Sequence, residues 1–237
     1  MTSHERVSDE QLAEQLSYYS RRAGEYNDWW LRRGAFDQGE SENAVWFHES
    51  GVALDALAAL DLGDDVLELA PGTGNWSVHL APRATRLTLV DGSVEMLAHN
   101  PAAGQPHVRT EIADLFTWDS AERFDSVVFA FWISHVPRER LASFFARVGS
   151  WLRPGGAVFF VDDLPRAVTS PHVAGVAGQT MTRRLNSGDT ATIVKNFFTA
   201  GELTGAAAAA GITMSVHETG RLFQYGATVT AAGRGAG

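Results

Sequence analysis

The sequence predicts an α/β fold built on a mostly parallel sheet, and three observations support this prediction. Residues 66–69 form a short apolar run that ends in a turn containing Gly72 and Gly74, after which amphipathic residues resume at Trp76. This order indicates a buried strand, a glycine-rich loop and the start of a helix. Residues 124–131 carry an uninterrupted apolar core, which is typical of a central parallel strand covered on both faces. With 237 residues, 45% of them hydrophobic, the chain can bury one substantial core.

Composition limits the kinds of molecule that we expect the protein to bind. The net charge of −9 argues against nucleic acid, whose phosphates require basic patches, and against a site on an anionic membrane surface. The absence of cysteine excludes disulfides and thiolate metal sites. The eight histidines lack the i, i+4 spacing of a helical zinc site, so no metal is expected. No apolar stretch resembles a signal peptide or approaches the roughly 20 residues of a membrane span, so we expect a cytoplasmic protein without membrane contact.

Local periodicity predicts the elements on either side of the glycine-rich loop. Helical spacing predicts helices over residues 8–19, 42–60, 93–97, 137–152 and 202–210. Apolar or alternating runs predict strands over residues 86–91, 108–112, 157–162, 212–216 and 223–229. The last two strands should form a closing hairpin, and Gly211 should end the preceding helix in a left-handed conformation. Residues 163–199 show no clean periodicity.

The loop motif Glu68-Leu69-Ala70-Pro71-Gly72-Thr73-Gly74 resembles the first motif of class I S-adenosylmethionine-dependent methyltransferases, an acidic residue followed by alternating glycines. Ala70 stands where the first glycine often sits, and alanine is expected to fit there only with a negative φ. The resemblance continues over about residues 60–230. It implies a Rossmann-like, seven-stranded, mostly parallel sheet with an antiparallel terminal hairpin and an N-terminal helical lid. It also implies S-adenosyl-L-methionine (SAM) as cofactor and S-adenosyl-L-homocysteine (SAH) as product.

On this resemblance the chain divides into two parts. Residues 1–60, with many aromatic side chains between residues 18 and 30, form the lid, and residues 61–237 form the cofactor-binding domain. Residues 163–199 occupy the place of a substrate-covering insertion in this family. The sequence leaves undecided whether the protein forms a homodimer in which the lid packs against a second subunit.

The expected cofactor contacts combine spacing with the resemblance. Asp91 ends the strand after the glycine loop, 17 residues beyond Gly74, close to the roughly 20 expected for a carboxylate that binds the ribose hydroxyls. The resemblance assigns the adenine amino group to Asp114 and the adenine ring to the Leu115 amide. It also places a tyrosine over the methionine end of the cofactor, although such rings can simply pack the lid onto the domain. The full set of expected contacts is Tyr19, Tyr26, Glu68, Ala70, Gly72, Gly74, Trp76, Asp91, Gly92, Asp114, Leu115 and Phe131.

The expected chemistry is displacement at an activated methyl group. The positive charge on the sulfur of SAM already activates the methyl group, so the protein must orient a nucleophile and exclude water. His135, which follows the central strand at residues 124–131, is the preferred general base, with a structural histidine as the alternative and His48 as a weaker rival. An amine nucleophile would need no strong base. We expect a small-molecule metabolite with an oxygen or nitrogen nucleophile as substrate, contacted by Trp30, Trp46, Trp132 and Arg184.

Two other classes of function remain open at this level. A dehydrogenase that uses NAD(P) shares the strand, loop, helix and ribose carboxylate, but the pattern Gly72-x-Gly74-x-x-Ser77 lacks the third glycine of that fingerprint. A binding protein or an enzyme that does not methylate could share the fold, because fold does not determine function.

Overall fold

The computed structural model describes residues 6–165 and 173–229. Within them, the larger sheet has seven strands in the order β3-β2-β1-β4-β5-β10-β9. The strands from β3 to β5 in this order pair in parallel, and β10 runs antiparallel to both of its neighbours. The bounds are β1 (Asp65–Leu69), β2 (Arg86–Asp91), β3 (Val108–Ile112), β4 (Phe124–Ala130), β5 (Leu152–Asp163), β9 (Met214–Glu218) and β10 (Phe223–Thr228). The predicted Rossmann-like sheet with a terminal hairpin is confirmed.

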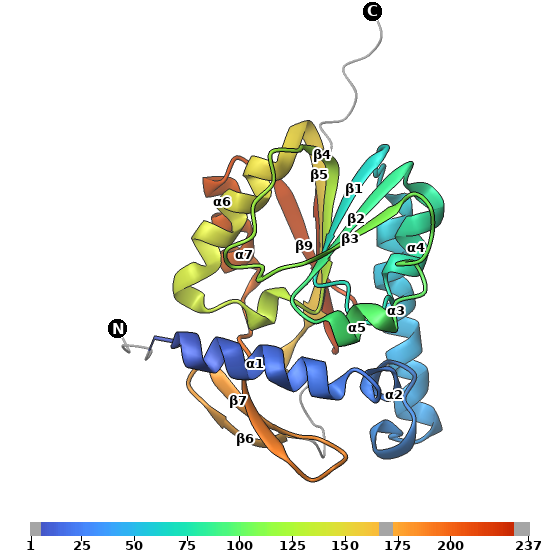
Figure 1. Cartoon of the computed structure of the whole chain (residues 1–237), viewed down its shortest axis with the longest axis vertical. Helices are drawn as coiled ribbons and strands as arrows, with labels where there is room; N and C mark the ends of the chain where they lie inside the picture. The colour runs from blue at the N-terminus through green and yellow to red at the C-terminus, as the bar shows by residue number, and fades with distance from the viewer. Residues whose placement is uncertain (1–5, 166–172, 230–237) are drawn as a thin grey trace, which may run out of the picture.

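Helices cover both faces of this sheet (Figure 1). They are α6 (Leu141–Trp151) and α7 (Ala200–Ala209) on one face, and α3 (Glu40–Ala59), α4 (Ser77–Leu80) and α5 (Val94–Ala98) on the other. The buried side chains accordingly form two clusters, one around Phe129 and Phe145 and one around Leu57 and Phe159. Because burial of each large apolar side chain contributes roughly 1.5–3 kcal/mol, these two layers fix the sheet from both sides.

The N-terminal helix α1 (Asp9–Arg22) lies across the carboxyl ends of the parallel strands (Figure 1). It begins at a capping box, in which the Ser8 hydroxyl accepts from the Gln11 N–H and the Gln11 side chain accepts from the Ser8 N–H. The short α2 (Tyr26–Trp30) and the 3-10 helix η1 (Gly34–Phe36) lead on to α3. The two predicted N-terminal helices are therefore confirmed, and α3 begins two residues earlier than expected.

Between β5 and α7 the chain forms a second, antiparallel sheet that periodicity did not reveal. Its strands are β6 (Val173–Ala177), β7 (Thr180–Arg184) and β8 (Thr190–Val194). One face packs Met181, Leu185 and Ile193 against Tyr18 of α1. The apolar residues on this face are too few to give a strand signal by themselves, so the sheet depends on its contact with α1.

Short 3-10 helices lie next to the ends of several longer elements. They are η2 (Ala81–Arg83), η3 (Ile133–His135) and η4 (Arg138–Arg140). The predicted helix over residues 137–152 therefore starts as η4 and becomes α-helical only at Leu141, and β4 ends one residue before the predicted limit at Phe131. No helix in the described part of the chain combines the length and the apolar character needed to cross a membrane.

Candidate active site

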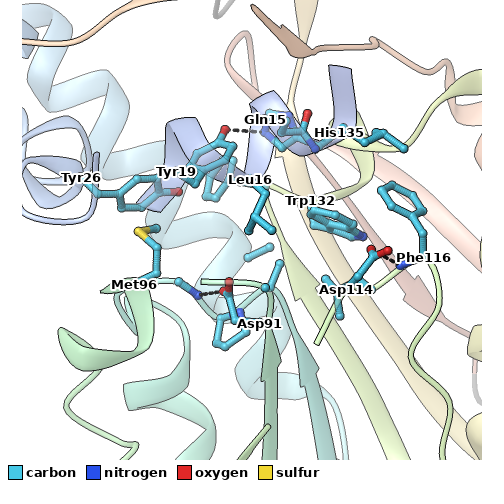
Figure 2. A pocket seen from close by; sticks show the side chains of 18 of the residues that line it. Gln15, Leu16, Tyr19, Tyr26, Asp91, Met96, Asp114, Phe116, Trp132 and His135 are labelled. Carbon is cyan, nitrogen blue, oxygen red and sulfur yellow. Dashed lines mark hydrogen bonds between the residues drawn. The ribbon is translucent and has the colours of Figure 1, made fainter. Parts of the chain in front are cut away.

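A cavity of about 480 Å³ opens at the carboxyl ends of β1, β2 and β4. Loops that follow these strands and β3 form its floor, and α1 and α2 form its roof (Figure 2). Open α/β sheets bind ligands at this edge, and the volume lies in the range of roughly 300–1,000 Å³ found for small-molecule sites. Floor residues that line the cavity include Glu68, Ala70, Gly72, Trp76, Asp91, Gly92, Asp114, Leu115, Phe131 and Trp132. Roof residues include Leu12, Leu16, Tyr19, Tyr26, Trp29 and Trp30.

The loop after β1 presents its main chain to the cavity. Gly72 has a φ of +56°, and its N–H donates a hydrogen bond of 2.9 Å to the Asp91 carboxylate. Ala70 has a φ of +51°, so the expectation of a negative φ there is wrong. A left-handed alanine costs on the order of 1–2 kcal/mol, and the 2.9 Å bond from its N–H to the Val90 carbonyl helps to hold it in place. Strain of this kind is typical of ligand sites, and Phe131 at φ +53° is a second case.

Two buried carboxyl groups face the cavity from β1 and β2. Asp91 also accepts the Ser93 N–H at 2.9 Å, and burial raises the pKa of Asp91 to about 6 despite its backbone hydrogen bonds. Burial raises the pKa of Glu68 to about 8, and its Oε2 has no hydrogen-bond partner among the described residues. Asp91 keeps lone pairs for the hydroxyls of a ribose, and the free oxygen of Glu68 can accept from a cationic or hydroxyl donor.

The other end of the floor suits a flat, polar ring. Asp114 follows β3, and its carboxylate accepts the Phe116 N–H at 2.9 Å (Figure 2). The rings of Phe116 and Trp132 lie with centroids 5.5 Å apart, and Leu16 faces them from α1. The indole N–H groups of Trp132 and Trp76 are buried without a partner in the described chain, so each leaves a donor for a ligand.

Tyr19 and His135 form a hydrogen-bonded pair where the roof meets η3. The Tyr19 hydroxyl lies 2.8 Å from His135 Nε2, and His135 Nδ1 lies 2.7 Å from the Val194 carbonyl oxygen. A carbonyl only accepts, so Nδ1 carries the proton and Nε2 accepts from Tyr19. Burial, helped by the charge of Lys195, lowers the pKa of His135 to about 3. Burial also raises the pKa values of the Tyr19 and Tyr26 hydroxyls. The imidazole is therefore neutral, with both nitrogens occupied.

Four residues singled out in the sequence lie outside the cavity lining. A Cβ on Gly74 would overlap the Asn100 side chain, so this glycine allows close packing of the loop on the residues after α5. Trp46 is buried beneath the roof, and its Nε1–H donates to the Trp30 carbonyl at 3.1 Å. Arg184 is exposed on β7, and His48 is exposed on α3.

The cavity also contains residues that sequence reasoning did not assign to it. Leu12 and Leu16 line it from α1, and their spacing of four residues, which puts both on one apolar face of the helix, is the signal that could have placed them over the cofactor. Asn75, Met96 and Phe116 contribute from the floor, and no sequence pattern singles them out because their positions depend on how the loops pack.

Comparison with known proteins agrees with this geometry. Residues 66–156 match the family model for a methyltransferase domain. The structure of a DhpI–SAH complex is 34% identical, covers 96% of this chain and 100% of that chain, and has a TM-score of 0.78. The structure of a DhpI–SAM–HEP complex is 35% identical over 94% of this chain and 99% of that chain, with a TM-score of 0.77.

A more distant relative is the ubiquinone/menaquinone biosynthesis C-methyltransferase UbiE of Rubrivivax gelatinosus. It is 31% identical over 101 residues, which are 42% of this chain and 39% of that protein. The chain therefore matches less than half of the length of this relative.

The fold and the cavity define a Rossmann-like protein that binds a nucleoside cofactor at the carboxyl edge of its sheet. With the similarities above, the chain belongs to the class I S-adenosylmethionine-dependent methyltransferases. SAM is accordingly the cofactor and SAH its product. The residues present fit this cofactor, because Glu68 and two indoles offer unpaired polar atoms to a ligand.

Proposed function

We propose that the protein transfers the methyl group of SAM to an oxygen or nitrogen nucleophile of a small metabolite by in-line displacement. The observation that carries this proposal is the cavity itself, which joins a floor suited to an adenosyl group with a roof of aromatic side chains. Enclosure of this kind excludes water and fixes the reactants, and orientation can supply roughly 7–11 kcal/mol of the barrier reduction. The similar DhpI holds HEP together with SAM, which supports an acceptor that shares the cavity with the cofactor.

The proposal gives the residues distinct roles. We assign the ribose to Asp91 and the adenine to Asp114, as the sequence led us to expect. We assign the methionine end to Glu68 as well as to a lid tyrosine, because the buried Oε2 of Glu68 has no partner among the described residues. We assign Tyr19 and Tyr26 to the reacting end of the cavity, which both rings line from the roof. The Tyr26 hydroxyl points into the cavity, whereas the Tyr19 hydroxyl is directed at His135 (Figure 2). His135 is buried, its pKa is lowered and both ring nitrogens are hydrogen-bonded. We therefore do not assign it the general-base role expected from sequence, and assign it the role of positioning Tyr19.

The division of the chain is part of the same proposal. Residues 1–60 act as a lid because α1 and α2 roof the cavity, and residues 163–199 cover the acceptor because β8 packs on α1. Of these two ranges, residues 1–5 and 166–172 lie outside the described part of the chain. A homodimer stays a prediction, to be tested by sedimentation of the purified protein.

Methyl transfer can be tested directly with the purified protein. We expect SAM and SAH to bind with a stoichiometry of one by calorimetry, and a small acceptor to gain the label from methyl-tritiated SAM. NAD and NADP serve as controls and should not bind. Tight binding of NAD without SAM binding would contradict the proposal, as would SAM binding by a protein that labels no member of a broad panel of small acids, alcohols and amines.

A further inference from the structure

Arg183 brings a positive charge to the inner face of the smaller sheet. Arg183 lies two residues after Met181 in β7, and Leu185 follows two residues later just beyond the strand, so the three side chains point to the same face. Met181 and Leu185 are buried against Tyr18 of α1. The Nε of Arg183 is buried and has no hydrogen-bond partner in the described chain. Tyr19 packs against the same cluster as Met181, so the guanidinium lies on the face of the sheet that meets the Tyr19–His135 pair. Burial raises the pKa of Tyr19 and lowers that of His135, and the charge of Arg183 acts to lower both pKa values.

Arg22 brings a second cation to the same place from the end of α1. Its side chain is 7% exposed, and its guanidinium lies 5.7 Å, 5.0 Å and 5.5 Å from the ring centroids of Tyr18, Tyr26 and Phe36. Its charge partly offsets the rise that burial causes in the pKa values of Tyr19 and Tyr26. Among the described residues, neither Arg22 nor Arg183 forms an ion pair, so two cations converge on the lid tyrosines without a counter-ion.

The carboxylates nearest to this region already have partners. Lys195 is buried, with its Nζ 3.3 Å from Asp162 and 2.7 Å from Asp163. On the α1 side, Glu14 accepts the Thr192 N–H at 2.8 Å, and Glu25 accepts the Asn186 N–H. Arg22 is buried and Arg183 is half-buried with its Nε away from water. Cations held in this way without a counter-ion are costly, which favours a ligand that supplies the negative charge.

Among the described residues of this region, every group that could accept a proton is already engaged. His135 Nε2 accepts from Tyr19, and its Nδ1 donates to Val194, so a proton could enter only by breaking one of these bonds and leaving an imidazolium beside Lys195 and Arg183. Asp162 and Asp163 are engaged by Lys195. A neutral alcohol would have to lose a proton here, whereas a nucleophile that arrives as an anion would not.

We propose, building on the methyl transfer proposed above, that the acceptor is a small organic oxyacid, and that Arg183 and Arg22 bind its carboxylate or phosphoryl group beside Tyr19. In the reaction, a lone pair of the oxyanion forms the new O–CH₃ bond. The S–CH₃ bond breaks, and its electron pair stays on sulfur to give the neutral thioether of SAH. One positive and one negative charge disappear together, so no proton is taken up or released and no base is required.

Loss of this charge also explains how the product leaves. The oxyacid enters as the counter-ion of the two arginines, and methylation removes one of its negative charges. Because charge-assisted hydrogen bonds are stronger than neutral ones, the methyl ester is held less tightly than the acid.

The first test measures anion binding to the SAH-loaded protein, with inorganic phosphate and acetate as separate probes. We expect saturable binding of at least one probe in a thermal-shift titration, weakened tenfold or more in Arg183→Gln and partly restored in Arg183→Lys. Arg184→Gln is the matched control, since this neighbour is exposed, and should bind as the wild type does. SAH affinity should be unchanged in all three variants. Absence of probe binding, or equal binding by Arg183→Gln and wild type, would overturn the proposal.

The second test counts protons during turnover. In weakly buffered solution with a pH indicator, turnover of a carboxylate acceptor, or of a phosphoryl acceptor at a pH well above its second pKa, should release no proton, whereas an alcohol or a protonated amine would release about one for each SAH formed. Turnover confined to alcohols or amines would sink the oxyacid proposal and leave methyl transfer intact. Failure of SAM itself to bind would instead count against the proposed function. Should Arg183→Gln fold poorly, Arg22→Gln provides an independent variant with the same expected loss of acid binding.

Discussion

The carboxylate of Asp91 has two roles. It accepts the N–H groups of Gly72 and Ser93 and so fixes the glycine loop against β2, and in our proposal it binds the ribose as well. We expect Asp91→Ala to raise the dissociation constant for SAH tenfold or more, about 1.4 kcal/mol, measured by calorimetry. Asp91→Asn, which keeps the shape of the side chain, should also weaken binding. Unchanged affinity in a correctly folded Asp91→Ala protein would show that the ribose lies elsewhere.

His135 makes folding stability depend on pH. The folded-state pKa of about 3 lies below the ordinary value of 6.5, so below pH 6.5 the unfolded chain takes up a proton that the folded protein refuses. The free energy of unfolding should therefore fall, by up to about 1.4 kcal/mol per pH unit, as the pH drops from 6.5 towards 3. Glu68 and Asp91 have raised pKa values and act in the opposite direction.

The contribution of His135 is isolated by comparison with His135→Gln. Urea unfolding at pH 7.5, 6 and 5 should show a stability difference between wild type and variant that shrinks as the pH falls, because the variant has no imidazole to protonate. A difference that stays constant over this range would contradict a neutral, buried His135. In the same variant we expect some methyl transfer to remain, since a positioning residue is not required to take a proton.

At the scale of elements, the glycine loop depends on close packing against the residues after α5. Gly74 has a φ of +87°, and an added Cβ would overlap Asn100. We expect Gly74→Ala to lower the free energy of unfolding by about 1–3 kcal/mol, because both backbone strain and overlap oppose the methyl group. The matched control is Gly104→Ala, where a Cβ meets nothing within 4 Å and φ is not positive. Equal urea midpoints for the two variants would contradict this account.

Elements of the main sheet were predictable because burial on both faces leaves long apolar runs, as in β4, and because caps such as Ser8 mark helix starts. The strands β6, β7 and β8 were not predictable, since only one face is buried and the partner, α1, is distant in sequence. The same limit explains why Arg184 was chosen as a substrate contact. Without knowledge of β7, nothing decides whether Arg183 or Arg184 faces inward, and in a strand adjacent side chains point to opposite faces.

At the scale of the whole molecule, topology predicts more of the site than side-chain packing does. Parallel strands bring their carboxyl ends to one edge, so the grouping of Asp91, Asp114 and His135 near one cavity follows from the fold. The sequence does not show that Trp30 lines the cavity and Trp46 does not, because both belong to the aromatic cluster between the roof and β10. Which ring of a packed cluster reaches the cavity depends on contacts between distant elements.

The helix α1 couples the cofactor cavity to the smaller sheet. Leu16 and Tyr19 line the cavity, and Gln15, which also borders it, accepts the Val194 N–H of β8 at 3.0 Å. A cofactor under α1 can enter only if this helix moves, so bound SAH should hold α1 and β8 closed. A ligand at 100 times its dissociation constant stabilises the bound state by about 2.7 kcal/mol, which would slow exchange through that opening roughly a hundredfold.

Hydrogen–deuterium exchange with and without SAH tests this coupling. We expect protection of amides in α1 and in β8, although β8 does not line the cavity, and no change in α7 on the far face of the sheet. Gln15→Ala removes the bond to Val194 and leaves Leu16 and Tyr19 in place, so it should keep the protection of α1 and reduce that of β8. Protection confined to the floor loops would mean that SAH binds without closing the helix. Protection of β8 undiminished in Gln15→Ala would mean that the coupling runs through the Glu14–Thr192 bond or the Tyr19–His135–Val194 chain instead.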